Sequence, residues 1–157
     1  MRLHTAAFDE LDVATLYALL RLRVDVFVVE QHCAYPDLDG RDAEPGARHL
    51  WLAGEMDGPS TPLACLRLLA EPDGSARIGR VAVSPPARGA GLARRLMEAA
   101  LLEIGDRPCV LDAQVNLVGF YRSLGFQVTG PEYLEDGIPH VPMRRAGAHA
   151  ADRALHH

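Results

Sequence analysis

The chain has 157 residues, a formal net charge of −5 and 48% hydrophobic residues, which suffices for the core of one domain. The negative charge argues against a nucleic-acid partner, because binding to phosphates requires a basic surface. No apolar run approaches the roughly 18 residues of a membrane span, and the N-terminus lacks the apolar region of a secretory signal, so we expect a cytoplasmic protein with no membrane partner.

The first half of the chain is expected to form one helix and three strands. Residues 12–29 are predicted to form an amphipathic helix, whose end is weakened by the β-branched residues of 24–29. Its expected apolar face consists of residues three and four positions apart: Val13, Leu16, Leu20, Val24 and Phe27. Residues 33–49 are rich in Pro, Gly and Asp and predict a loop. Three strand-like runs follow, separated by turn signals: residues 49–55, 62–71 and 77–84. Together they predict an antiparallel meander.

The second half predicts alternating helices and strands. Residues 92–104 carry an apolar stripe formed by Leu92, Leu96, Ala100 and Ile104, which indicates a helix. The further expected elements are a strand at 109–114, a short helix at 117–126 and strands at 127–130 and 140–143. This order predicts a mixed α/β sheet with helices on its faces. We expect a single domain over residues 1–145 and a flexible tail over 146–157.

The turn that opens the 92–104 helix contains Arg88, Gly89 and Gly91 after two prolines. A glycine-rich turn at a helix N-terminus presents unpaired amides and the positive end of the helix dipole, which suits a phosphate group. A P-loop is excluded because the sequence has no lysine. The dinucleotide motif GxGxxG fits Gly89, Gly91 and a later Asp112, but Arg94 stands at the third glycine and the preceding strands form a meander.

The same turn fits the pattern R-x-x-G-x-A at Arg88, Gly91 and Ala93, and it resembles the acyl-CoA loop of the GNAT superfamily of N-acetyltransferases. Downstream, "NLVGFYRSLGF" resembles the later helix of that superfamily that contacts CoA, with Asn116 at an N-cap position and Tyr121 on the helix. Segments across residues 8–143 resemble its ElaA-like branch, which often has histidine where Asn116 stands. The resemblance implies a GNAT-like mixed, mostly antiparallel central sheet flanked by helices on both faces.

The resemblance also implies direct transfer of an acetyl group from acetyl-CoA to an amine of a small molecule, without a covalent enzyme intermediate. The loop amides would meet the pyrophosphate and the preceding strand would pair with the pantetheine arm. The strand at 109–114 would have to splay away to make room. The expected cofactor-binding residues are Val81, Ala82, Val83, Arg88, Gly89, Ala90, Gly91, Leu92, Ala93, Arg94, Asn116 and Tyr121.

The implied acetyl transfer includes two proton transfers, and each needs a side chain as proton donor or acceptor. Tyr121 can donate to the leaving thiolate. An alkyl amine is mostly protonated at neutral pH, so a base must remove its proton, and Glu30, His49, Asp112 and His140 are the alternatives. Burial at a helix end would raise the pKa of Glu30, whereas His49 is expected to be structural and Asp112 to make a polar contact. The candidate catalytic residues are therefore Tyr121, Glu30 and His140, without a choice of base.

Other interpretations stay open. The chain could be a non-catalytic acyl-CoA-binding sensor or partner module, and residues 23–28 resemble a stretch of acyl-homoserine lactone synthases. The acids at 37–44 could attract a cationic amine or lie in a solvated loop: Asp37, Asp39, Asp42 and Glu44. The three scattered cysteines, Cys33, Cys65 and Cys109, are expected to be reduced thiols and predict no metal site. The sequence does not indicate an oligomeric state, and the chain could form a homodimer.

Overall fold

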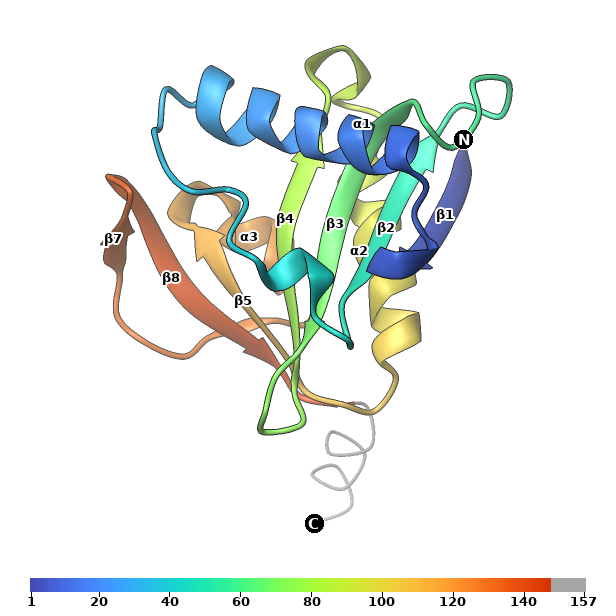
Figure 1. The fold of residues 1–157 in the computed structure, drawn as a ribbon. Helices are drawn as coiled ribbons and strands as arrows, with labels where there is room; N and C mark the ends of the chain where they lie inside the picture. The colour runs from blue at the N-terminus through green and yellow to red at the C-terminus, as the bar shows by residue number, and fades with distance from the viewer. Residues whose placement is uncertain (148–157) are drawn as a thin grey trace.

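An eight-stranded sheet with helices on both faces organises residues 1–147, the part of the chain that the computed structural model describes (Figure 1). The strands are β1 (Arg2–Ala7), β2 (Arg48–Ala53), β3 (Pro62–Ala70), β4 (Ala76–Val83), β5 (Cys109–Gln114), β6 (Gln127–Val128), β7 (Tyr133–Glu135) and β8 (Ile138–Arg145). The helices are α1 (Val13–Val24), α2 (Leu92–Ile104) and α3 (Val118–Arg122). None of the helices in residues 1–147 has the length and apolar character that crossing a bilayer requires.

The strands lie in the order β1-β2-β3-β4-β5-β8-β6, and β7 pairs with β8. Every neighbouring pair is antiparallel except β4 and β5, which are parallel because α2 connects them. The expected mixed, mostly antiparallel sheet with helices on both faces is confirmed.

Each face of the sheet has its own core. On one face α1 packs Leu19 and Leu22 against Trp51 of β2 and Ala82 of β4. The other face is covered by α2 and α3 (Figure 1). There α2 buries its predicted apolar stripe against β2 to β5, and Tyr121 of α3 joins this core. The two cores fix β4 between α1 and α2, so that the C-terminal end of β4 is held from both sides.

The apolar face predicted for α1 is wrong: it is rotated by part of a helical turn from the face that the structure buries. Val13 is 85% exposed, whereas the helix buries Thr15, Leu19, Leu22 and Arg23. A buried arginine is invisible to hydrophobic periodicity, and here two acids outside the helix neutralise it. The weakened helix end is confirmed, because residues Asp25–Glu30 continue as a wider π-helical turn.

The terminal strands were only partly predicted. Two strands were not predicted: β1, which pairs along its whole length with β2, and β7, which pairs with β8. β8 is longer than the expected 140–143, and β6 covers only the start of 127–130. The predicted domain boundary at residue 145 is the end of β8, and the flexible tail predicted for 146–157 lies from residue 148 onward outside the described residues.

Candidate active site

A gap between β4 and β5 creates the site. The two strands pair only at Ala76 with Cys109 and at Arg77 with Val110, near their N-terminal ends. Beyond these pairs β4 continues to Val83 and β5 to Gln114 without pairing to each other, so their C-terminal halves diverge. The predicted splaying of the 109–114 strand is confirmed. It leaves one edge of β4 without a strand partner.

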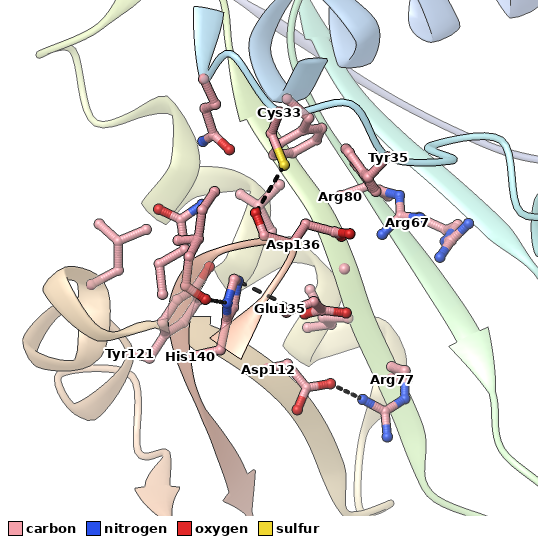
Figure 2. Close-up of a pocket in the computed structure, with 18 of the residues that line it drawn as sticks. Cys33, Tyr35, Arg67, Arg77, Arg80, Asp112, Tyr121, Glu135, Asp136 and His140 are labelled. Carbon is pink, nitrogen blue, oxygen red and sulfur yellow. Dashed lines mark hydrogen bonds and ion pairs between the residues drawn. The ribbon is translucent and has the colours of Figure 1, made fainter. Parts of the chain in front are cut away.

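Two cavities occupy the gap. A channel of about 620 Å³ lies beside the C-terminal end of β4 and is lined largely by apolar side chains such as Phe27, Val81 and Phe120. A second, polar cavity of about 200 Å³ lies next to it and is closed by the β7–β8 hairpin (Figure 2). The cavities share the lining residues Phe27, Gln31, Val81, Gln114, Leu117 and Tyr121. A molecule in the channel and a molecule in the polar cavity would therefore meet beside Tyr121.

The loop before α2 has the geometry of an anion cradle. Gly89 and Gly91 adopt φ of +86° and +75°, and Gly91 is the N-cap of α2. Among residues 1–147 no side chain caps this end of α2, so its first amides remain available and the helix dipole favours an anion there. A Cβ atom at either glycine would meet no atom within 4 Å. Glycine is therefore required by the backbone conformation and not by crowding.

Arg88 and Glu30 form an ion pair at the mouth of the channel. Both η nitrogens of Arg88 donate to the two carboxylate oxygens of Glu30, and Nε donates to the Val83 carbonyl at 3.1 Å. Glu30 is exposed, and the hydrogen bonds from Arg88 lower its pKa. The expectation that burial would raise this pKa is wrong, because the π-helical turn points Glu30 away from the core and toward a guanidinium. A carboxylate in this state is a weak base.

Tyr121 lies on α3 at the junction of the two cavities. It is 7% exposed, and its ring makes edge-on contacts with Phe120 and Phe126. Burial raises the pKa of Tyr121 to about 12, and no hydrogen bond contributes to this shift. The phenol therefore stays protonated at neutral pH and has its O–H available for a ligand.

His140 lies on β8, opposite Gln114 of β5, and lines the polar cavity (Figure 2). Its Nδ1 lies 2.7 Å from the Ile138 carbonyl, which can only accept, so Nδ1 carries the proton. In the neutral ring Nε2 is then an acceptor, and it lies 3.9 Å from a carboxylate oxygen of Glu135. The ring stacks on Tyr133. These contacts orient a basic nitrogen within the cavity.

The remaining predicted site residues have simpler surroundings. His49 is buried, with Nε2 bonded to the Asp42 carbonyl, and burial lowers its pKa, which confirms a structural role. Asp112 pairs with Arg77 at 2.9 Å, which confirms the polar contact. Asn116 is exposed in a separate turn, Val115–Leu117, and Leu117 is the N-cap of α3. The N-cap prediction for Asn116 is wrong because this turn intervenes.

Arg94, expected at the pyrophosphate, links α2 to α3 in the structure. Its Nη2 donates to the Ser123 hydroxyl, and its guanidinium lies 5.5 Å from the centre of the Phe120 ring. Both contacts lie beside the cavity that Gly89 and Gly91 line. Arg94 is therefore adjacent to the anion cradle, but its charge is turned toward α3.

The acids of the 37–44 loop were misinterpreted. Asp37 and Asp42 are buried and pair with Arg23, and Asp42 and Asp39 also pair with Arg67 of β3. Asp37 and Asp42 are thus not solvated, whereas Asp39 and Glu44 stay partly exposed, and both are paired with arginines. The pairing of these acids with arginines had one signal in the sequence, an arginine at position 67 within an otherwise apolar strand.

A sequence model of the acetyltransferase (GNAT) domain matches residues 49–146. The chain is 49% identical over 148 residues to a UPF0039 protein of Mycobacterium tuberculosis, with 92% of each chain covered. It is 42% identical over 145 residues to protein ElaA of Escherichia coli, covering 87% of this chain and 91% of ElaA.

Two solved structures are also similar. An acyl-CoA N-acyltransferase from Pseudomonas aeruginosa superposes with a TM-score of 0.86 at 41% identity, covering 93% of this chain and all of the other. The crystal structure of Escherichia coli ElaA superposes with a TM-score of 0.84 at 39% identity, covering 92% of this chain and 98% of ElaA. The likeness thus extends over nearly the whole of each chain.

Proposed function

This chain belongs to the ElaA-like branch of the GNAT acetyltransferase family, and on that premise we propose that it transfers an acetyl group from acetyl-CoA to the amine of a small molecule. Membership of the family and the acyl-CoA N-acyltransferase neighbour support acyl transfer. The proposal of acetyl transfer to a small amine rests on two cavities that meet at Tyr121. One is an apolar channel beside the anion cradle, and the other is small and polar.

The residues around the channel fit an acyl-CoA. The amides at the start of α2, freed by the left-handed Gly89 and Gly91, suit a pyrophosphate. The unpaired edge of β4 offers backbone donors and acceptors to the amides of a pantetheine arm, as a sheet edge does to an added strand. Acetyl-CoA bound there would supply the thioester, whose C–S bond breaks as the new C–N bond forms.

Tyr121 is the proposed proton donor. Because its hydroxyl stays protonated and faces the junction, it can donate a hydrogen bond to the sulfur that leaves as a thiolate. Burial in the apolar core strengthens such a hydrogen bond relative to water. The side chains of Phe27 and Leu117, which line both cavities, exclude water from the same place.

His140 is the proposed base. An amine near pKa 10 must lose a proton before it can attack, directly or through a water molecule. Nε2 of His140 lies in the polar cavity with its tautomer fixed by the Ile138 carbonyl. We prefer it to Glu30, which lines only the channel and is engaged by Arg88.

Thiol release from acetyl-CoA, measured against a panel of primary amines, tests the proposal, and calorimetry measures binding separately. Gly91→Asp is expected to abolish binding, because it adds a like charge where the pyrophosphate would approach. Gly74→Asp is the matched control, since Gly74 has a φ of +90° and open space at its Cβ position but lies in the β3–β4 turn. Equal acetyl-CoA affinity in the two variants contradicts the loop assignment. Tight binding without thiol release for any amine favours a non-catalytic acyl-CoA-binding module.

A further inference from the structure

We propose, resting on the function proposed above, that the acceptor carries a carboxylate beside its amine, as an amino acid does. The charged side chains of the polar cavity are divided between two walls (Figure 2). Arg67 and Arg80 line it from β3 and β4, whereas Glu135 and Asp136 line it from the β7–β8 hairpin. Arg77 and Asp112 also line the cavity, but they neutralise each other as an ion pair at 2.9 Å. The division matches a small molecule with a negative group at one end and a positive group at the other.

The arginine wall is built and rigid. The side chain of Arg67 is 5% exposed, and its two η nitrogens donate to Asp39 and Asp42 at 2.8–3.3 Å. Arg80 is held by Asp37 at 2.9 Å and lies 5.4 Å from the centre of the Tyr35 ring. These acids belong to the loop behind the cavity and do not line it. They hold both guanidinium groups in place without occupying the cavity itself.

The arginine wall also has an unused donor. It is not Nε of Arg67, which lacks a hydrogen-bond partner among residues 1–147 but is fully buried and out of reach of a ligand in the cavity. Within the same residues nothing accepts from Nη1 of Arg80, whose Nη2 donates to the Asp37 carbonyl and to Asp39. A guanidinium offers more donors than its acids take up here, and a carboxylate is the acceptor that it matches in shape.

The backbone of Arg80 supports the same conclusion. Its φ is +53°, in the left-handed region that side chains other than glycine rarely adopt. It lies where the register between β3 and β4 shifts, and the shift turns β4 locally. Strain of this kind is typical of positions where the direction of a side chain matters for a site.

The opposite wall suits an ammonium group. Glu135 lies within ion-pair distance only of His140, which is charged only when protonated, and the Asp136 carboxylate has no ion pair among the described residues. Figure 2 places His140 and Tyr121 on the side of the cavity away from Arg67 and Arg80. An amine at the acidic wall would therefore lie beside the proposed base and the reacting thioester, with its carboxylate directed toward the arginines.

The size of the cavity limits the acceptor. The cavity has a volume of about 200 Å³, less than the channel of about 620 Å³, and this suits a small acceptor. An amine without a carboxylate would fill the acidic end but leave the arginine donors facing an unmatched group, at a cost in affinity.

The test compares matched acceptors that differ only in the carboxylate: phenylalanine with phenethylamine, leucine with isopentylamine and lysine with cadaverine. Product formation is followed by thiol release and mass spectrometry. The wild-type protein is expected to prefer the amino acid of at least one pair by about 10-fold or more in kcat/KM, since one charge-assisted hydrogen bond accounts for that ratio. Equal kcat/KM within every reactive pair, or reaction of the amines alone, overturns the inference.

Arg80→Lys keeps the charge that neutralises Asp37 and Asp39 but removes the planar fork. It is expected to reduce the ratio of kcat/KM for the amino acid to kcat/KM for its matched amine by about 10-fold. A merely destabilised protein would lose both rates in parallel. Arg48→Lys is the control, because Arg48 makes its ion pairs with Glu10 and Glu103 away from the cavity. An equal change of the ratio in both variants contradicts the inference.

Binding gives a readout that does not depend on turnover. Calorimetric titration of the same three amino acids into protein saturated with CoA is expected to show binding that Arg80→Lys weakens by about 10-fold. Absence of binding by all three amino acids overturns the inference. If acetyl-CoA binds and the amino acids bind but no thiol is released, the acetyl-transfer proposal fails while the assignment of the cavity stands.

Discussion

Replacing Tyr121 by phenylalanine separates a catalytic hydroxyl from a structural one. Burial alone raises the pKa of Tyr121, and no hydrogen bond of its hydroxyl contributes to this shift. Removing the hydroxyl therefore leaves no buried partner unsatisfied. The aromatic contacts with Phe120 and Phe126 remain. We therefore expect the free energy of unfolding to change by less than about 0.5 kcal/mol. The affinity for acetyl-CoA should also stay close to that of the wild type.

The rate should respond differently. A hydrogen bond to a charged group contributes about 1.5–3 kcal/mol, which corresponds to a loss of roughly 10- to 150-fold in kcat if the hydroxyl donates to the leaving thiolate. Thiol release gives kcat, calorimetry gives the Kd of acetyl-CoA, and urea unfolding gives stability. Tyr17→Phe is the control, because Tyr17 is 70% exposed on the outer side of α1. Equal kcat for Tyr121→Phe and wild type refutes the donor role, and a large loss of stability refutes the view that the hydroxyl is unpartnered.

Two further predictions concern the base and acid stability. His140→Gln is expected to lower kcat/KM about 100-fold in thiol-release assays. Glu30→Gln should keep kcat and tighten acetyl-CoA binding by releasing Arg88. The opposite pattern would make Glu30 the base. Burial raises the pKa of Asp39, but hydrogen bonds from Arg67 and from the backbone of Arg41 outweigh it and lower the pKa to about 2. Because this folded value lies below that of the unfolded chain, the contribution of Asp39 to stability is complete above about pH 4 and is lost as the pH falls toward 2. Asp39→Asn should flatten that part of the acid-unfolding curve.

The cofactor side of the site was predictable because it depends on backbone conformation. Glycine at positions 89 and 91 before an amphipathic helix indicates left-handed residues and free amides, and the structure has both. The meander of β2, β3 and β4 follows from apolar runs and turns. The parallel placement of β5 follows from α2, since a helix must connect parallel neighbours. Local sequence is sufficient for each of these features.

The acceptor side was not predictable because it depends on contacts between distant residues. Glu30 follows an apolar helix end, which suggested burial, but its environment is set by Arg88, 58 positions later. Cys33 donates to the carbonyl of Asp136 on the β7–β8 hairpin, 103 positions away, and β7 itself carries no clear strand pattern. Hydrophobic periodicity indicates which face of a helix or strand is apolar, but it does not indicate which charged side chains will pair with each other.

The ion pairs among the buried charged residues of segment 23–80 hold the arginines of the polar cavity in place. Removing one member of a buried ion pair leaves its partner unpaired at a cost of about 3–5 kcal/mol. Arg23 of α1 pairs with both Asp37 and Asp42, and Asp42 also pairs with Arg67 of β3. The acids of the loop therefore hold two different elements of the fold. The network therefore joins α1, the 37–42 loop and β3 in one fixed arrangement. The network already balances three arginines against three aspartates. Under the proposal above, it would hold the guanidinium donors in position, so that an incoming carboxylate would not have to reorganise them.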